Sequence, residues 1–461
     1  MMMDWKGKRI LIIGAARQGQ ALARFLACHA AAVTLNDKQT DEQLARVKSS
    51  LQDVDIHWIS GGHPVSALQN IDLVCLSGGV PLTNPLVGEA NKLGIAISND
   101  TQIFMEHVSA RVIGITGSAG KTTTTTLVGR MAKEAVTGKV NAWIGGNIGN
   151  PLIADVDRMK KDDLVIMEVS SFQLEQMTIS PAIGAVLNIT PNHLDRHGTM
   201  EAYTALKARL LAFQTPEDIA ILNRDDAGSS GLAPSCKGRI YTFGMEQDGS
   251  TNPQTFVSNH RIYFAEHGHA IQLLDVADIQ LRGEHNLMNV LAACAIACAA
   301  GFDTRAIKCG IQDFTGVPHR MQFIRDYHGA KWYNDSIATT PERSMAAIRS
   351  FTEPIVLLAG GRDKDLLWVD FARLVHQRVF HLVLFGEAAG KIKTAIDKVN
   401  IGSNVVTIDM CSSLQEAVGI AANYARSGYV VLLSPGGTSF DEFLDFEKRG
   451  EAFSQWVQEL S

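Results

Sequence analysis

Short apolar runs rich in Val, Ile and Leu alternate with longer Ala-rich segments along most of the chain. The run RILIIG at 9–14 is followed by the helix-like QALARFLACHA at 20–30 and then by AVTLND at 32–37. Continuous apolar runs of this length are typical of strands buried on both faces, and their alternation with helices is typical of parallel β-α-β units. The pattern therefore predicts an α/β fold.

The apolar runs gather in three clusters, and a length of 461 residues also favours about three domains. We predict domains at 1–107, 108–316 and 317–461, each built on a mostly parallel sheet: Rossmann-like, phosphate-loop and Rossmann-like in chain order. The segment 236–282 predicts a small β excursion. The predicted strands are 9–14, 32–37, 71–77, 111–117, 163–171, 182–190, 218–223, 354–361, 381–386, 404–409 and 429–437.

Composition narrows the class of protein. The formal net charge is −6 and no dense block of Lys and Arg occurs, which argues against nucleic acid as a partner. The seven cysteines are scattered and never form a C-x-x-C pair, which predicts reduced thiols in a cytosolic protein, without a disulfide framework or a zinc site. The N-terminus shows no secretory signal, and no apolar stretch approaches the length of a membrane span.

The turn GAARQG at 14–19 follows the first predicted strand and opens a helix. It keeps the outer glycines of G-x-G-x-x-G, and Asp37 ends the next strand near the place of a ribose-binding acid. Ala16 replaces the glycine that lets a pyrophosphate approach, which argues against NAD. A plain strand-helix turn and a site for another nucleotide moiety at this helix N-terminus both fit the pattern. The turn SGGVPLTNP at 77–85 has the same character.

The second cluster opens on GITGSAGKTTTTT at 114–126, between a predicted strand and a predicted helix. The usual phosphate loop is G-x-x-x-x-G-K-[ST], but here the first glycine stands at 117, nearer the lysine. Gly117 and Gly120 permit a tight turn of closely spaced N–H groups. Lys121 can reach terminal phosphates and Thr122 can bind Mg²⁺. We therefore predict a variant phosphate loop.

Two further residues near this loop have the chemistry of Mg²⁺ ligands. Glu168 ends a predicted strand and His193 follows another. A carboxylate and an imidazole near a phosphate loop can hold Mg²⁺ together with nucleotide oxygens. For His193 the residues alone leave a structural role equally open, and a lone helix lysine such as Lys207 is ordinarily solvent-exposed.

The loop T-G-S-A-G-K-T-T resembles the shortened phosphate loop of the Mur ligase family, T-G-T-N-G-K-[ST], with Ala119 in place of the common Asn. The resemblance covers essentially the whole chain. It is carried further by GGNIG (145–149), MEVSSFQLE (167–175), NITPNHLDRHGTMEAYTALKARLL (188–211), GEHNLMNVLAA (283–293), GVPHRMQ (316–322), NDSIATTP (334–341), LLAGGRDKD (357–365) and LLSPGGTSFDEFLDFEKRG (432–450).

The resemblance implies roles for residues that the pattern alone leaves open. It implies that Lys207 is carbamylated and helps bind a second Mg²⁺, which gives catalytic residues Lys121, Glu168, His193 and Lys207 and metal ligands Thr122, Glu168, His193 and Lys207. The predicted ATP-binding residues are Gly117, Ser118, Ala119, Gly120, Lys121, Thr122, Thr123, Asn286, Asn289, Arg320 and Asp335. The predicted substrate-binding residues are Arg17, Gln18, Asp37, Ser77, Gly78, Asn147, Ser170, Gln173, Thr339, Lys364, Ser439 and Phe446.

Within the family the chain is most similar to the members that add glutamate to UDP-N-acetylmuramoyl-L-alanine. This implies a cytoplasmic, monomeric, ATP- and Mg²⁺-dependent ligase of peptidoglycan precursor synthesis that adds D-glutamate through an acyl phosphate. The D-glutamate members typically carry Lys in N-D-S-K-A-T, where this chain has Ile337. That lysine helps bind the amino acid, so an L-glutamate-adding member is the alternative. A generic phosphate-loop NTPase, a nicotinamide enzyme and a folylpolyglutamate synthetase are more remote alternatives.

Overall fold

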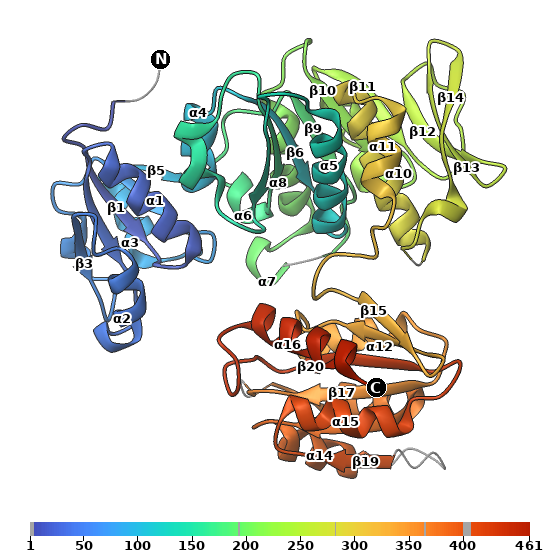
Figure 1. Cartoon of the computed structure of the whole chain (residues 1–461). Helices are drawn as coiled ribbons and strands as arrows, with labels where there is room; N and C mark the ends of the chain where they lie inside the picture. The colour runs from blue at the N-terminus through green and yellow to red at the C-terminus, as the bar shows by residue number, and fades with distance from the viewer. Residues whose placement is uncertain (1–3, 192–193, 282, 364–365, 400–406) are drawn as a thin grey trace. The chain divides into compact units, whose positions relative to one another are not determined.

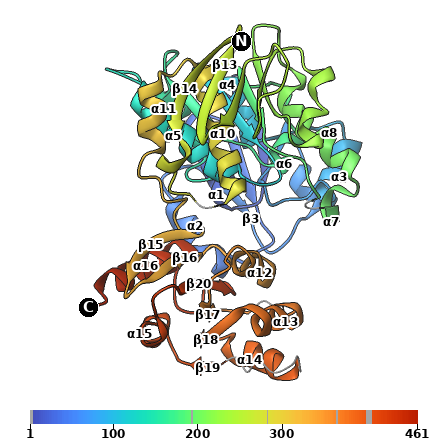
Figure 2. The same cartoon turned by 90° about the vertical axis from the view of Figure 1, so that its right-hand side faces the viewer.

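The computed structural model describes residues 4–191, 194–281, 283–363, 366–399 and 407–461. The chain divides into two compact units, residues 1–314 and residues 315–461. Figures 1 and 2 show the strands and helices of each unit from two directions. Among the described residues, no helix combines the length and the apolarity that a membrane crossing requires.

The first unit begins with a wholly parallel sheet in the order β3-β2-β1-β4-β5. Alternate residues of β1 face opposite sides: Ile10 and Ile12 pack in the core with helix α1, whereas Leu11 and Ile13 pack with α3. The sheet is therefore covered on both faces. The elements are β1 Arg9–Ile13, α1 Arg17–Cys28, β2 Ala32–Asn36, α2 Asp41–Ser50, β3 Ile56–Ile59, β4 Leu73–Leu76, α3 Pro85–Lys92, β5 Ala96–Asn99 and α4 Asp100–His107.

The second sheet of this unit runs in the order β14-β13-β12-β11-β10-β9-β6-β8-β7. It is parallel from β7 to β12 and antiparallel in the hairpins β12–β13 and β13–β14, so the predicted β excursion extends the sheet. The strands are β6 Arg111–Thr116, β7 Ala142–Gly146, β8 Leu164–Glu168, β9 Ile183–Val186, β10 Ile219–Asn223, β11 Arg239–Phe243, β12 Gln254–Ser258, β13 Arg261–Glu266 and β14 His269–Asp275.

Helices α5 and α10 lie side by side against this sheet, α11 packs on α5, and α8 contacts β6 and β9 (Figure 1). From Asn289 onward helix α10 is apolar nearly all round and mostly buried, because it packs against both the sheet and α5. The α-helices are α5 Lys121–Ala135, α6 Ser171–Leu174, α7 Leu194–His197, α8 Met200–Ala212, α9 Ala227–Ser230, α10 Glu284–Ala300 and α11 Thr304–Ile311.

The second unit holds a sheet in the order β15-β16-β20-β17-β18-β19, parallel except for the β15–β16 hairpin. Residues of α12, α13 and α14 share one core with one face of the sheet, and residues of α15 and α16 share another core with the opposite face (Figure 2). The elements are β15 Gln322–Tyr327, β16 Ala330–Asn334, α12 Pro341–Arg349, β17 Ile355–Gly360, α13 Val369–Arg378, β18 Val379–Phe385, α14 Ala389–Lys398, β19 Thr407–Met410, α15 Leu414–Tyr424, β20 Val430–Gly436 and α16 Phe446–Glu459.

The predicted α/β class with three mostly parallel sheets is confirmed. Strands β3, β5, β7 and β15 escaped sequence reasoning, and each lies at an edge of its sheet. Edge strands are covered less completely, so they lack the continuous apolar run of a central strand. The predicted strand at 404–409 is β19 from Thr407 onward, and residues 404–406 lie outside the described part of the chain.

Candidate active site

The phosphate loop lies at the carboxyl end of β6, in the middle of the parallel part of its sheet. Strand pairing places Ile115 beside Glu168 of β8, and Thr116 beside Val186 of β9. The Val169 N–H donates to the Ile115 carbonyl, and the Thr116 hydroxyl donates to the Val169 carbonyl. The ends of the two strands are therefore locked together, as expected for a ligand site at the carboxyl edge of an open α/β sheet.

The loop is braced by the segment that follows β9. Asn188 accepts a hydrogen bond from the Ala119 N–H at 2.8 Å, and its amide donates to the Ala119 carbonyl at 3.2 Å. The Ser118 hydroxyl donates to the Thr190 carbonyl at 2.9 Å. Sequence reasoning missed Asn188, although its place at a strand end in the motif NIT was a usable signal. This bracing fixes the loop before any ligand binds.

Gly120 closes the loop in the left-handed conformation, with φ +81°, and Lys121 begins α5. A Cβ at position 120 would meet the Asn289 amide oxygen at 2.1 Å. The Lys121 ammonium donates to the Gly117 carbonyl at 2.8 Å, so it lies against the loop that would bind the phosphates. Thr122 and Thr123 stand in the first helical turn, where N–H groups and the helix dipole favour an anion.

Helix α10 brings Asn286 and Asn289 next to the loop. The Asn289 amide donates to the Asn286 side-chain oxygen at 3.2 Å, and its own oxygen faces Gly120. These two predicted ATP-binding residues therefore sit together with the phosphate loop, although their contacts here are with protein atoms.

Glu168 is buried at the end of β8, and its two carboxylate oxygens have different surroundings. Oε1 accepts a hydrogen bond from the Asn147 amide at 2.7 Å, whereas Oε2 is buried without a hydrogen-bond partner. An unpartnered buried carboxylate oxygen is costly unless a cation binds it. Glu168 therefore fits a divalent metal, for which carboxylates are the preferred protein ligands.

The described residues contain no group of three or more His, Cys, Asp or Glu side chains that would hold a metal by themselves. His193, predicted as a ligand, lies outside the described residues, as does Lys364 of the predicted substrate set. Among the described residues, a metal at Glu168 would be completed by groups of other kinds, including Thr122.

Lys207 of α8 is almost fully buried, unlike an ordinary helix lysine. Its ammonium donates to the Thr116 hydroxyl and to the Gly117 carbonyl, each at 3.0 Å. Burial, reinforced by nearby Lys121 and opposed by Glu168, holds the pKa of Lys207 well below its usual range. The side chain therefore reaches the base of the phosphate loop from α8, a helix that contacts β6.

The turn after β1 meets the turn after β4. The Gly78 N–H donates to the Gln18 side-chain oxygen at 3.1 Å, and Ser77 lies against Gly14. Asp37 accepts from the Ala15 N–H at 2.8 Å, so the carboxylate holds the 14–19 turn from the neighbouring strand end. These residues form the carboxyl edge of the first sheet.

Arg17 extends from this edge to the central sheet, where its guanidinium donates to the Gly149 carbonyl at 3.5 Å. Gly149 belongs to the same GGNIG segment as Asn147. Ser170 and Gln173 form a capping box at the start of α6, with the Ser170 N–H donating to the Gln173 oxygen at 2.9 Å. The predicted substrate residues of the first unit thus come from both of its sheets.

In the second unit, Asp335 directly follows β16 and is buried. It accepts hydrogen bonds from the Met321 N–H at 3.2 Å and from the Ser434 hydroxyl at 2.9 Å, and burial raises its pKa to about 7. Arg320 is exposed and exerts an electrostatic pull on this carboxylate. Both residues therefore lie at one end of the sheet.

The segments that hold Thr339, Ser439 and Phe446 converge near the same end. The Ser336 hydroxyl donates to the Phe446 carbonyl at 2.8 Å, and the Gly436 N–H donates to the Ala338 carbonyl at 2.9 Å. Thr339 is half-buried, Ser439 is buried, and the Phe446 ring stands edge-on to His319. The three predicted substrate residues therefore share one region of the fold.

Arg449 organises this region, and sequence reasoning did not single it out within the quoted F-x-x-RG ending. Its guanidinium is buried and donates to the Ser336 hydroxyl at 3.0 Å, the Ser336 carbonyl at 2.8 Å and the Gly437 carbonyl at 3.1 Å. Burial lowers its pKa to about 10. Arg449 therefore ties the 334–337 and 436–439 segments together.

The matched families follow the three sheets. Residues 8–99 match the "Mur ligase MurD-like, N-terminal domain", residues 115–297 the "Mur ligase middle domain" and residues 319–437 the "Mur ligase, glutamate ligase domain". A UDP-N-acetylmuramoylalanine--D-glutamate ligase of Pelotomaculum thermopropionicum is 39% identical over 461 residues, covering 100% of this chain and 99% of the relative. The chain belongs to the Mur ligase family. Another ligase of that name, from Symbiobacterium thermophilum, is 37% identical, covering 98% of this chain and 98% of the relative.

Solved structures show the same fold at lower identity. UDP-N-acetylmuramate-alanine ligase MurC from Thermotoga maritima aligns over 98% of this chain and 99% of its own, with a TM-score of 0.57 and 17% identity. A pseudomurein peptide ligase type C from Methanothermus fervidus covers 99% of this chain and 100% of its own, with a TM-score of 0.52 and 18% identity. Mur ligases thus share this fold despite low sequence identity.

Gly120→Ala is expected to weaken nucleotide binding at least about ten-fold, because an added methyl both strains a left-handed residue and displaces Asn289. Gly138→Ala is the matched control, since Gly138 has a similar φ of +70° but open space around its Cβ position. Titration of each variant with ATP by calorimetry would measure the effect. Equal affinities of the two variants would contradict the role assigned to Gly120.

Proposed function

We propose that this Mur ligase joins D-glutamate to UDP-N-acetylmuramoyl-L-alanine at the expense of ATP, in cytoplasmic synthesis of peptidoglycan precursors. Full-length similarity to ligases of that name supports the substrate pair. One structural observation carries the chemistry. Glu168 is buried beside the phosphate loop, and one of its two carboxylate oxygens has no hydrogen-bond partner among the described residues. It provides an anion for a metal where the phosphates of ATP would bind.

The reaction consists of two transfers. The carboxylate of UDP-N-acetylmuramoyl-L-alanine attacks the γ-phosphorus of ATP, which yields an acyl phosphate and ADP. The amine of glutamate then attacks the acyl carbon, loses a proton and expels phosphate from the tetrahedral intermediate. Lys121 offsets the charge that develops on the transferring phosphate. The acyl phosphate requires a site from which water is excluded.

Mg²⁺ would be held by Thr122, Glu168 and His193, and it would supply charge neutralisation on the phosphate oxygens. Asn147 keeps one Glu168 oxygen engaged at 2.7 Å and so orients the other toward the ligand side. Gly117, Ser118, Ala119, Gly120 and Thr123 complete the cradle, and Asn286 and Asn289 bound it from α10.

The sugar nucleotide would bind at the carboxyl edge of the first sheet, where Arg17, Gln18, Asp37, Ser77 and Gly78 gather. We assign residues 1–107 to this substrate, residues 108–316 to ATP and residues 317–461 to the amino acid. Asn147, Ser170 and Gln173 would meet the sugar nucleotide from the central domain, and the enzyme would act as a monomer.

The second unit would supply the remaining contacts. Asp335 would bind the ATP ribose and Arg320 a phosphate. Lys364 and Ser439 would bind a carboxylate of glutamate, Thr339 would also contact this substrate, and Phe446 would pack on the aliphatic part. The buried Arg449 holds the segments around Ser336 and Ser439 in one arrangement, which favours a preformed amino-acid site.

Ile337 stands where the D-glutamate members typically carry Lys, so this region lacks one positive charge. A neighbouring arginine offers a replacement for that charge. Arg343, in the first turn of α12, directs its guanidinium to 3.4 Å from the Ile337 carbonyl. We propose that Arg343 supplies the charge that position 337 lacks and binds a carboxylate of glutamate.

The buried position of Lys207 favours the proposed carbamate. Addition of CO₂ to the unprotonated amine forms an N–C bond and releases one proton, which turns the side chain into an anion beside the phosphate loop. Glu168 and the carbamate would then both face the metal region.

With ¹³C-bicarbonate, the wild type is expected to show a carbamate carbonyl resonance that Lys207→Arg abolishes. Lys133→Arg, a substitution at an exposed lysine of α5, serves as the control and should keep the resonance. A spectrum without the resonance in the wild type, or with it in Lys207→Arg, would refute the carbamate.

Phosphate release measured with ATP, Mg²⁺ and UDP-N-acetylmuramoyl-L-alanine is expected to require D-glutamate. Parallel reactions contain L-glutamate or no amino acid. Release only with L-glutamate would assign the enzyme to the other branch, and release independent of the sugar nucleotide and the amino acid would leave a generic NTPase.

Arg343→Ala is expected to raise the KM for D-glutamate about ten-fold or more, because a charge-assisted hydrogen bond to a carboxylate is worth roughly 1.5–3 kcal/mol. Adding Ile337→Lys to this variant should lower the KM again. Arg349→Ala, at an exposed position in the last turn of the same helix, should leave it unchanged. An unchanged KM in Arg343→Ala would rule out the assignment.

A further inference from the structure

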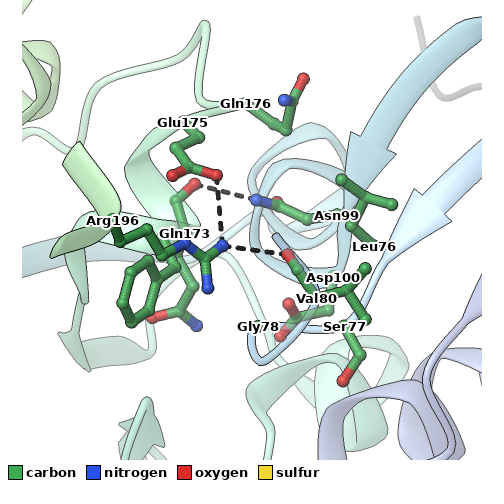
Figure 3. Close-up of a pocket in the computed structure, with 11 residues that line it drawn as sticks. Leu76, Ser77, Gly78, Val80, Asn99, Asp100, Gln173, Glu175, Gln176 and Arg196 are labelled. Atoms are coloured by element: carbon green, nitrogen blue, oxygen red, sulfur yellow. Dashed lines mark hydrogen bonds and ion pairs between the residues drawn. The ribbon is translucent and has the colours of Figure 1, made fainter. Parts of the chain in front are cut away.

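Arg196, in the short helix α7, contacts two other segments of the first unit, the turn after β4 and the end of α6. Its guanidinium donates to the Val80 carbonyl at 2.9 Å, lies 3.7 Å from the Glu175 carboxylate, and stacks 3.8 Å from the centre of the Phe172 ring. Figure 3 shows Arg196 between Glu175 on one side and the segment around Val80 on the other. One side chain therefore joins the turn after β4 to helix α6 and the residue that follows it.

The side of this arrangement formed by α6 and α7 is rigid. The His197 ring stacks on Phe172 with centroids 5.4 Å apart and contacts the Ser171 hydroxyl at 3.0 Å. Asn99, at the end of β5, donates to the Gln173 carbonyl at 2.9 Å. Arg196 thus projects from a well-packed support.

Glu175 is a second anchor for the guanidinium. Its carboxylate is largely buried, with 9% of the side chain exposed, and burial raises its pKa while the charge of Arg196 opposes that shift. A carboxylate in such a site is stabilised by a nearby cation, so it holds the arginine in place. Arg196 can therefore keep one side fixed on Glu175 and Phe172 while it binds Val80.

The turn after β4 is tied to its own sheet, where the Ser77 N–H donates to the Ile13 carbonyl and the Gly78 N–H donates to the Gln18 side-chain oxygen. Ser77 and Gly78 precede Val80 in this turn, and Arg196 lines the pocket together with all three of them (Figure 3). A neighbouring pocket of about 390 Å³ is lined by Pro81, Leu82, Thr83 and again Arg196. Arg196 therefore lines both pockets, which border the segment from Ser77 to Thr83.

We propose that Arg196 is a positioning residue that fixes the 77–85 segment against α6 and α7, so that the sugar-nucleotide side of the site has one geometry relative to Glu168. The proposal rests on the proposed function for what the segment binds. Arginine suits the role because its flat guanidinium can stack on Phe172 and donate to two acceptors at once, whereas an ammonium cannot.

Arg196→Ala is expected to raise the KM for UDP-N-acetylmuramoyl-L-alanine about ten-fold or more, with kcat and the KM for ATP within about three-fold of the wild type. Arg196→Lys should recover part of the loss, because its ammonium can replace one of the donors but not the stacking. An equal rise in the KM for ATP, or no rise in either, would overturn the proposal.

Arg209→Ala is the matched control. Arg209 donates to the Leu174 and Met177 carbonyls and so braces the segment after α6 without touching the 77–85 segment. Hydrogen exchange of the amides in 77–85, measured by mass spectrometry, should become at least about ten-fold faster in Arg196→Ala and stay unchanged in Arg209→Ala. Equal acceleration in both variants would indicate general loosening and overturn the proposal.

The kinetic and the hydrogen-exchange measurements together distinguish a failure of this inference from a failure of the proposed function. If the wild type shows no turnover that depends on D-glutamate, the proposed function fails, yet the exchange measurement still decides whether Arg196 fixes the segment. If the wild type turns over D-glutamate and Arg196→Ala behaves like Arg209→Ala, the positioning role alone is wrong.

Discussion

The pairing of β6 with β8 is the constraint on which the candidate active site depends. It sets Ile115 beside Glu168, so the start of the phosphate loop and the buried carboxylate lie next to each other at the carboxyl edge of the sheet. The Thr116 hydroxyl and the Val169 N–H close the two strand ends against each other. A slip of one residue would turn Glu168 to the opposite face of the sheet, because side chains alternate along a strand.

Buried basic side chains hold loops in place within each of the two units. Lys207 reaches Thr116 and Gly117 beneath the phosphate loop, and Arg449 joins Ser336 to Gly437 in the second unit. Each donates to hydroxyl and carbonyl oxygens, and burial lowers the pKa of both side chains. Burying a basic side chain is costly for stability, and groups whose pKa is shifted by burial cluster at functional sites.

The same chemistry explains how residues distant in sequence come to serve one reaction. Strand ends deliver Gly117, Glu168 and Asp37 to carboxyl edges, because parallel strands all end on one side. The arginines then connect edges: Arg17 reaches Gly149, and Arg196 reaches Val80. A guanidinium can bridge two or three acceptors, which suits it to junctions between layers.

The sequence by itself determined the α/β class, the central strands and the phosphate loop, because these depend on local periodicity and on the conformational freedom of residues such as Gly120. It also indicated Glu168, since a polar residue at the end of a buried strand points to the carboxyl edge. The edge strands β3, β5, β7 and β15 were not predicted because their partial exposure breaks the apolar pattern.

Only the tertiary structure decided which long basic side chains are drawn into contacts with distant segments. Helical periodicity treats Lys207 as exposed, and nothing near Arg196 or Arg449 in the chain marks its partners, which lie as far as 116 and 113 residues away. Such contacts arise from the packing of separate layers. Their physical basis is burial, which no local pattern encodes, because a lysine or an arginine becomes buried only where the rest of the fold offers it acceptors.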